Sequence, residues 1–392
     1  MDLFEKESSY FFHTYKRLHL DIERGEGCYL YARDGKRYLD LFGGLAVNAL
    51  GYSNPRVIAA IEKQIRRYMH LSNYYVQDPQ VGLAERLISV SGFQRLFFSN
   101  SGTEAVEGAI KLARKWGTPQ GKTWIYSLSN SFHGRTMGAL SLTDRPHYRE
   151  GYAPFLPDTG HIGFNDVAAL RATVNAQTLA VILEFIQGEG GINVVSQEFA
   201  DALVDLRKKF GFLIIADEIQ AGIGRTGKFF GFEHYGLRPD IIVFAKAIGG
   251  GLPLGGLLGN ERVAETFGPG AHGTTFGGNP VACAAGIATF DEIVSGGLMK
   301  NAGAIGAYMK DQVAALQKDF PAIVKEFRGY GCMMGIDLHR PGQPIVDELQ
   351  NRGILVNCTS NTVIRLLPPL TITTEHCDLL IRELRNIFGG LQ

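Results

Sequence analysis

The fold is constrained most strongly by an uninterrupted apolar run, Ile-Ile-Val-Phe-Ala at residues 241–245, that leads directly into a lysine. Such a run is typical of a parallel strand that is buried on both faces of a sheet. Lys246 follows it, and five glycines stand within the next ten residues. Because ligands of open α/β sheets bind beyond the carboxyl ends of the strands, we expect Lys246 to lie where an amine can take part in chemistry.

Two interpretations of Lys246 are open at this point. A desolvated lysine with a lowered pKa can attack an aldehyde and form an imine, which is how proteins hold pyridoxal phosphate. A lysine at a strand end can also extend its amine into water, and for an isolated lysine this is the commoner case. The other motifs of the chain decide between the two.

Strand-like and helix-like patterns alternate along most of the chain, which favours a mostly parallel, doubly wound sheet. We predict strands at residues 95–98, 124–126, 180–183, 212–215 and 241–244, helices at about 103–116 and 198–210, and a long irregular section from 127 to 163. Ser196 and Gly211 are the expected caps of the second of these helices.

The pattern changes after about residue 290. A helical stretch at 290–320 is followed by strand-like runs at 330–338, 354–356 and 363–367 and by a helix at 374–388, while the first fifty residues hold a hairpin with an Asp34-Gly35 turn. The 392 residues exceed what a single core usually holds. We therefore predict an N-terminal segment (1–50) that joins a C-terminal small domain (291–392), and a large cofactor-binding domain (51–290).

Composition excludes several classes of function. Lys plus Arg equals Asp plus Glu at 39 each, so the chain lacks the basic excess of a nucleic-acid-binding protein and gives no reason to expect binding to a membrane. No apolar run is long enough for a membrane span, and the charged first residues argue against a signal peptide. The five cysteines lack the paired spacing of a zinc site or a redox couple, so we expect free thiols and no metal. These features predict a soluble cytoplasmic protein.

A polar, glycine-rich segment follows each predicted strand of the large domain. Backbone N–H groups around Gly102, at the start of a helix, can form an anion site that the hydroxyls of Ser101 and Thr103 complete, although such a sequence is more often only a helix cap. Phe132 offers an aromatic face for a flat ring and Arg135 a guanidinium for a carboxylate. A core phenylalanine beside a surface arginine is the alternative.

Two adjacent carboxylates, Asp217 and Glu218, follow the strand at 212–215. A buried carboxylate needs a partner, and a protonated pyridine nitrogen is suitable because the opposite charges stabilise each other in a low dielectric. A metal ion is the rival partner, but adjacent residues of a strand point to opposite faces, so only one of the two can face a given site. Glu184, after the strand at 180–183, could pair with an arginine or be solvated.

Taken together, the motifs resemble those of the class III, ornithine-type aminotransferases that depend on pyridoxal phosphate. The resemblance runs in order along nearly the whole chain and rests on Ser101-Gly102-Thr103-Glu104-Ala105, Phe132-His133-Gly134-Arg135-Thr136, Gln187-Gly188-Glu189-Gly190-Gly191, Asp217-Glu218-Ile219-Gln220, Gly224-Arg225-Thr226-Gly227, Ala245-Lys246-Ala247-Ile248-Gly249-Gly250-Gly251, Thr274-Thr275-Phe276-Gly277-Gly278-Asn279-Pro280 and Arg365-Leu366-Leu367-Pro368-Pro369. It implies an α/β protein of fold-type I, in which a smaller α/β domain accompanies a large domain with a mostly parallel, doubly wound sheet.

The resemblance also implies a role for each matching residue. Lys246 would bind the cofactor covalently and Asp217 would hold its pyridine nitrogen. The other implied cofactor contacts are Phe132 and Ile219 on the two ring faces, Gln220 at the ring hydroxyl, and Gly102, Thr103 and Thr275 at the phosphate. The implied substrate contacts are Arg135, Thr274, Arg365 for the α-carboxylate of 2-oxoglutarate or glutamate, and Glu184 as a gate on Arg365. Because Thr275 would come from a second subunit, a homodimer is expected.

Within the class, the chain most resembles the enzymes that act on N-acetylornithine. This implies a ping-pong transfer of the terminal amino group of N2-acetylornithine to 2-oxoglutarate, which gives N-acetylglutamate 5-semialdehyde and glutamate in arginine biosynthesis. Lys246, once freed, would act as general base and acid. Succinylornithine, ornithine, 4-aminobutyrate and acetyllysine are the alternative donors, and an aminomutase is the alternative reaction, against which Arg365 argues. A nucleotide-binding module is disfavoured because its phosphate-binding motifs are missing from the sequence.

Two features make parts of this assignment less direct. Phe185 stands where the family usually has proline, which changes the stiffness of the backbone next to the proposed gate, Glu184. Tyr74 and Tyr75 are candidates for the substrate entrance, but two tyrosines in a loop are about as often ordinary packing residues.

Overall fold

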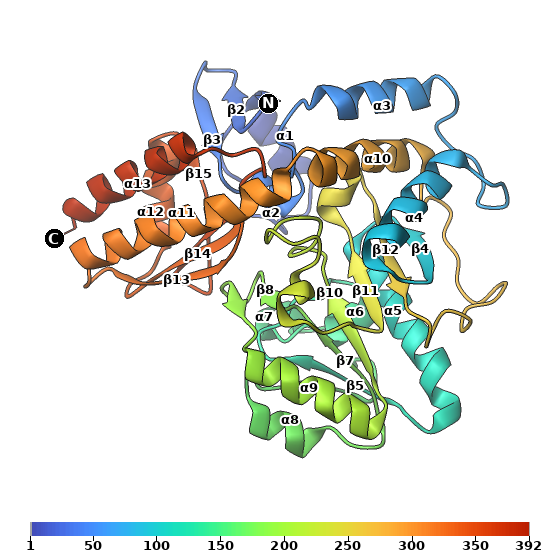
Figure 1. The fold of residues 1–392 in the computed structure, drawn as a ribbon. Coiled ribbons are helices and arrows are strands. Elements are labelled where there is room, and N and C mark those ends of the chain that lie inside the picture. The colour runs from blue at the N-terminus through green and yellow to red at the C-terminus, as the bar shows by residue number, and fades with distance from the viewer. Residues whose placement is uncertain (1, 392) are drawn as a thin grey trace.

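The computed structural model describes residues 2–391, and its largest sheet is built mainly from the strands that the sequence predicts (Figure 1). Seven strands form it in the order β4 (Arg95–Ser99), β12 (Gly255–Gly259), β11 (Ile241–Phe244), β10 (Leu213–Asp217), β7 (Thr178–Leu183), β5 (Trp124–Leu128) and β6 (Thr159–Ile162). The pairs formed by β12 are antiparallel and the other pairs are parallel. The predicted mostly parallel sheet is therefore confirmed, whereas β6 and β12 were not predicted as strands.

Helices cover both faces of this sheet because its central strands are apolar on both sides. Ile241 and Val243 pack with α5 (Gly102–Gly117), whereas Ile242 and Phe244 belong to the core on the opposite face. That opposite core includes α8 (Val167–Thr173), α9 (Gln197–Phe210) and α10 (Pro280–Ser295). The sheet is doubly wound, as expected.

The predicted helix caps are present. The Ser196 hydroxyl accepts a hydrogen bond from the N–H of Phe199 at the start of α9, and Gly211 ends α9 in the left-handed conformation, at φ 70°. A side chain is strained in that conformation, which is why glycine follows the helix. The Gly211 cap ends α9 two residues before β10 begins.

A second, antiparallel sheet forms near the C-terminus, beside the large sheet (Figure 1). Its strands lie in the order β13 (Val324–Tyr330), β14 (Met333–Leu338), β17 (Val363–Leu366) and β16 (Asn357–Thr359). The helices of this region are α11 (Leu298–Asp319), α12 (Gln343–Asn351) and α13 (Thr374–Gly389). Arg365 lies in β17 and therefore belongs to this sheet rather than to the large one.

The N-terminal hairpin pairs with C-terminal residues. β1 (Ile22–Glu26), β2 (Tyr29–Ala32) and β3 (Arg37–Asp40) form an antiparallel ribbon. On its other side, β3 pairs in parallel with β15 (Ile354–Leu355). The hairpin predicted around Asp34-Gly35 is confirmed by the β2–β3 pairing. The division of the chain at residues 50 and 290 stays a prediction.

Shorter elements connect these parts. They are α1 (Leu3–Tyr10), α2 (Gly43–Ala46), α3 (Pro55–Ile65), α4 (Asp78–Ser91), α6 (Met137–Ser141), α7 (Pro146–Arg149), β8 (Ile186–Gln187), β9 (Asn193–Val194) and the 3₁₀ turns η1 (Thr118–Gln120), η2 (Gly231–Tyr235) and η3 (Lys246–Gly249). Within residues 2–391 no single helix has the length and hydropathy of a membrane span, although the consecutive helices α10 and α11, bent by 60°, meet that criterion together.

Candidate active site

A cavity of about 440 Å³ lies at the carboxyl edge of the large sheet. The structure brings together around it nine of the residues predicted for the site, namely Gly102, Thr103, Phe132, Arg135, Glu184, Asp217, Ile219, Gln220 and Lys246. Thr274, Thr275 and Arg365 are not among the residues that line it. The convergence of β4, β5, β7, β10 and β11 on one edge of the sheet explains why residues so far apart in the sequence meet here.

Lys246 lies two residues beyond the end of β11, in a backbone conformation that is uncommon for a residue with a side chain, at φ 54°. Burial lowers the pKa of its ammonium group, an effect that the nearby Glu189 opposes and Arg365 reinforces. Lys246 Nζ has no hydrogen-bond or ion-pair partner among the described residues. A desolvated amine that is free of partners is suited to act as a nucleophile and a base.

Asp217, at the end of β10, is buried and held on two sides. Its Oδ1 accepts a hydrogen bond from the N–H of Ile219 (3.1 Å), and its Oδ2 lies 2.6 Å from Nδ1 of His133. Nε2 of His133 is buried and has no partner among the described residues. His133 was not predicted as a site residue, although its place between Phe132 and Arg135 in the same motif was a signal that could have found it.

The phosphate end of the predicted cofactor matches the start of α5. Ser101 caps this helix, so the N–H groups of its first turn point toward the cavity edge. A side chain at position 102 would meet Ile219, because an added Cβ would lie 2.7 Å from its Cδ1. Glycine is therefore required if Ile219 is to approach the helix start this closely.

The hydroxyl of Thr103 is already engaged within the protein. Thr136 donates its hydroxyl proton to Glu107 (2.6 Å), so Thr103 must be the donor in the 2.8 Å contact between the two threonine hydroxyls. The same Thr103 oxygen accepts from the N–H groups of Arg135 and Thr136, both at 3.3 Å. Any contact of Thr103 with an anion is therefore expected through its backbone N–H.

These groups fit pyridoxal phosphate. The buried Gln220 Oε1 has no partner among the described residues and can accept from a ring hydroxyl. Asp217 supplies an anion for a protonated ring nitrogen, Lys246 an amine for the aldehyde, and the start of α5 a site for the phosphate. Phe132 and Ile219 supply the apolar lining that a flat ring needs.

The predicted gate contact between Glu184 and Arg365 is not present in the structure. The Glu184 carboxylate accepts hydrogen bonds from the N–H groups of Phe132 and Gly188, both at 3.0 Å, and burial raises its pKa to about 7. Arg365 instead pairs with Glu189 at 2.5 Å. Glu184 is held in place by backbone donors, so Glu189, five residues further along, occupies the position that the sequence analysis gave to Glu184.

In the ion pair between Arg365 and Glu189, the arginine is almost fully shielded from solvent. Arg365 is 1% exposed, and its Nε also donates to Oδ1 of Asn357 (3.1 Å). Burial raises the pKa of Glu189, but the charge and the hydrogen bond of Arg365, together with the charges of Lys246 and Arg145, outweigh burial and hold this pKa below its ordinary value. Phe185 is fully buried against the ring of Tyr235, 5.1 Å away, so it packs in the core next to Glu184.

Arg135 is exposed at the mouth of the cavity and lies over the ring of Tyr148, 3.4 Å from its centroid. Tyr148 comes from α7, in the section that was predicted to be irregular, and was missed for that reason. The aromatic contact holds the guanidinium in place while leaving its donors free for a carboxylate.

Thr274 and Thr275 do not line this cavity, although Asn100, which does, donates to the Thr274 hydroxyl (3.4 Å). Both line a separate hollow of about 950 Å³ together with Tyr74, which is 97% exposed. The Thr274 hydroxyl accepts from the N–H of Gly277 (3.1 Å), and Thr275 is exposed. The entrance role of Tyr74 and Tyr75 stays a prediction.

Comparison with known proteins identifies the family of this chain. A family model described as aminotransferase class-III matches residues 10–388. The acetylornithine aminotransferases of Aquifex aeolicus and Methanocaldococcus jannaschii are 42% and 43% identical, covering 97% and 98% of this chain and 100% and 98% of the relative. Among solved structures, ornithine aminotransferase from Toxoplasma gondii superposes with a TM-score of 0.94 at 30% identity, covering 99% of this chain and 94% of the other. Acetylornithine aminotransferase from Elizabethkingia anophelis gives a TM-score of 0.89 at 31% identity, with 99% and 98% covered.

Proposed function

Since this chain belongs to the class-III aminotransferases, we propose that it transfers the terminal amino group of N2-acetylornithine to 2-oxoglutarate, giving N-acetylglutamate 5-semialdehyde and glutamate. The fold is the predicted fold-type I architecture. The observation that carries the choice of donor is the match, along the full length of the chain, to relatives that bear the name acetylornithine aminotransferase. The reaction belongs to arginine biosynthesis.

The cofactor of this class is pyridoxal phosphate, which supplies an aldehyde that takes up an amino group and a ring that stabilises negative charge on the neighbouring carbon. Asp217, with His133 behind it, would keep the ring nitrogen protonated. Gln220 would accept from the ring hydroxyl, and the N–H groups of Gly102 and Thr103 would bind the phosphate. Phe132 and Ile219 would contact the two faces of the ring.

Lys246 would carry the proton transfers. Burial lowers the pKa of its ammonium group and so favours the neutral amine, whose Nζ would take the proton from the amine-bearing carbon of the substrate and hold it for return. The amine has no partner to break away from before it acts, which lowers the cost of each transfer.

Two substrates of different charge must use the same pocket. The far carboxylate of the donor would bind Arg135, whereas 2-oxoglutarate and glutamate carry a second carboxylate for Arg365. The ion pair between Glu189 and Arg365 would neutralise Arg365 while the donor is bound. Displacement of Glu189 would free Arg365 for the dicarboxylic substrate, so we propose Glu189 rather than Glu184 as the gate.

A donor panel with 2-oxoglutarate as acceptor tests the function. We expect N2-acetylornithine to have the highest kcat/KM, by roughly tenfold or more over ornithine, 4-aminobutyrate and N-succinylornithine. The reason is that an acetyl group would fill its part of the pocket, whereas the other donors lack this group or carry a larger one. A different preferred donor would change the assignment within the class. Amine migration without release of glutamate would instead indicate a mutase.

The gate is tested by comparing Glu189→Gln with Glu184→Gln. Loss of the charge at position 189 should raise activity with donors that need Arg365, relative to N2-acetylornithine, since Arg365 is no longer neutralised. Glu184→Gln should leave this ratio close to that of the wild type, because Glu184 contacts backbone donors. The reverse pattern would restore Glu184 as the gate.

A homodimer in which Thr275 reaches the phosphate of the partner subunit is proposed on two grounds. Thr275 is exposed and does not line the cavity of its own chain. Its loop lies beside exposed apolar residues, among them Phe276 at 59% and Tyr74 at 97%, and exposed apolar patches of this kind mark interfaces. Sedimentation of the wild type should show a dimer, and Thr275→Ala should weaken cofactor binding.

We further propose a cytoplasmic location, where a reducing environment suits the five free cysteines.

A further inference from the structure

Arg225 is a buried cation that no step of the proposed reaction uses. Its side chain is 1% exposed and lies in the loop that follows the cofactor-holding residues 217–220. Nη1 donates to the carbonyl oxygens of Cys332 (3.3 Å) and Pro368, whereas Nε and Nη2 have no partner among the described residues. A buried cation with unused donors is costly, so its presence suggests a role other than stability.

The two carbonyls lie at the same end of the pair of strands that carries Arg365. β14 and β17 run antiparallel, with Gly335 opposite Arg365. Cys332 directly precedes β14, and Pro368 follows β17 by two residues. One nitrogen of Arg225 therefore holds both strands at the end nearest to the loop from the large sheet.

Two further contacts bring the same segments together. The N–H of Cys332 donates to the carbonyl oxygen of Arg225 (2.8 Å). Gly331 has φ 55°, and an added Cβ would lie 2.5 Å from the carbonyl carbon of Thr226. Both the conformation and the close approach require glycine at position 331.

We propose that Arg225 is a positioning residue that sets the distance between the cofactor-holding segment 217–220 and Arg365, and so determines how tightly the dicarboxylic substrates bind. This inference rests on the proposed function, in which Arg365 binds the second carboxylate of 2-oxoglutarate and glutamate. Arg135, which serves the donor, lies over Tyr148 of α7 and not on this pair of strands. Arg225 therefore acts on one half-reaction.

The holoenzyme variant Arg225→Met tests this, with Arg262→Met as matched control. Arg262 also donates to backbone carbonyls, those of Phe212 (3.2 Å) and Gly211 (2.8 Å), but at the opposite edge of the sheet. Arg225→Met should raise KM for 2-oxoglutarate and for glutamate by roughly tenfold or more, because small displacements of a binding group have large effects. KM for the donor should stay within about twofold, and Arg225→Lys should recover part of the loss. Arg262→Met should lower thermal stability without changing either KM.

Equal changes in the KM values of donor and acceptor, or no change in either, would overturn the positioning role. If Arg225→Met does not fold, Gly331→Ala tests the same contact. It should likewise raise KM for 2-oxoglutarate and glutamate while leaving KM for the donor nearly unchanged. The wild type is measured first, because a wild type that makes no glutamate would refute the proposed function. If the wild type is active but Arg225→Met does not change KM for the acceptor more than KM for the donor, only the role of Arg225 is refuted.

Discussion

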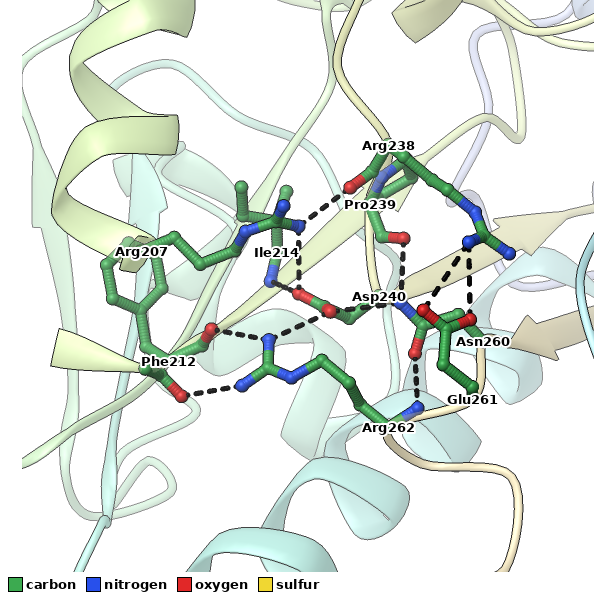
Figure 2. A network of polar contacts seen from close by, with 10 residues as sticks. Arg207, Phe212, Ile214, Arg238, Pro239, Asp240, Asn260, Glu261 and Arg262 are labelled. Carbon is green, nitrogen blue, oxygen red and sulfur yellow. Dashed lines mark hydrogen bonds and ion pairs between the residues drawn. The ribbon is translucent and has the colours of Figure 1, made fainter. Parts of the chain in front are cut away.

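The two edges of the large sheet differ in whether their buried polar groups are hydrogen-bonded within the protein. At the amino edge, the fully buried Asp240 accepts from the N–H of Ile214 (2.8 Å), Asn260 (3.0 Å), Arg262 (2.9 Å) and Arg207 (3.4 Å), as Figure 2 shows. At the carboxyl edge, the buried Gln220 Oε1 and His133 Nε2 have no partner among the described residues. Lys246 Nζ forms no hydrogen bond or ion pair with those residues either. The buried polar groups named at the amino edge find their hydrogen-bond partners within the protein. Those named at the carboxyl edge would find theirs in a bound ligand.

Two buried lysines make the contrast direct. Lys122, just before β5, is 8% exposed, and its Nζ donates to the carbonyl oxygens of Ala176 (3.1 Å) and Phe210 (2.6 Å). It ties together the amino ends of three strands, β5, β7 and β10. Lys246 is also desolvated, but its Nζ forms no hydrogen bond or ion pair with another described residue. Burial lowers the pKa of both ammonium groups, so the pKa direction does not separate them, whereas hydrogen bonding does.

The largest effect is expected from Lys246→Ala. Transamination should fall by roughly 10⁴-fold or more, since the variant lacks the amine that we propose binds the cofactor and moves the proton. The unfolding temperature without added cofactor should not fall, because no bond of Nζ is removed. Steady-state kinetics and thermal unfolding measure the two quantities.

Lys122→Met is the matched control for that prediction. It should retain the specific activity of the wild type but unfold at a lower temperature, because two carbonyls lose their donor. An active Lys246→Ala enzyme, or an inactive but stably folded Lys122→Met enzyme, would break the contrast between the edges.

Asp240→Ala should give the largest loss of stability. Removing the carboxylate leaves Arg262 and Arg207 without their anion, and breaking a buried pair in this way costs about 3–5 kcal/mol. KM and kcat should change little where the variant is folded. Chemical denaturation gives the free energy of unfolding, with Arg238→Ala as control, since its pair with Glu261 is exposed and is worth about 1 kcal/mol or less. Similar losses for both variants would mean that the burial of Asp240 does not matter.

A smaller, pH-dependent effect is expected from Glu218. Burial raises the pKa of this carboxyl to about 8, against the opposing hydrogen bonds from the N–H groups of Gly231 and Phe232. The native state therefore holds the proton more tightly than the unfolded chain does. Its contribution to stability is complete below the ordinary pKa and is lost as the pH rises toward 8, with a slope of at most about 1.4 kcal/mol per pH unit.

Denaturation between pH 5 and 8 should show this decline in the wild type and a flatter dependence in Glu218→Gln. Glu261→Gln, an exposed site, should keep the wild-type slope. An unchanged slope in Glu218→Gln would place the titrating group elsewhere, and Glu184, with its pKa raised to about 7, would be the next to test.

Sequence patterns predicted the elements whose apolar residues are continuous or periodic, such as β11 and α9. They missed β12 and β6, because Gly255-Gly256 and Gly160 have little strand propensity of their own and are strands only through their neighbours. Residues that follow strand ends could be assigned to the site, since topology brings those ends together. Glu184 and Glu189 could not be told apart, because only the turn between β8 and β9 decides which carboxylate faces Arg365.

β12 runs antiparallel between β4 and β11, so the chain turns back into the middle of the sheet within ten residues of Lys246. Both flanks of Lys246 are therefore anchored in interior strands of the sheet, whose amide hydrogens exchange with solvent only when much of the domain opens. The backbone on each side of Lys246 is thus held in place while surface loops fluctuate, so its amine keeps a fixed origin relative to the sheet.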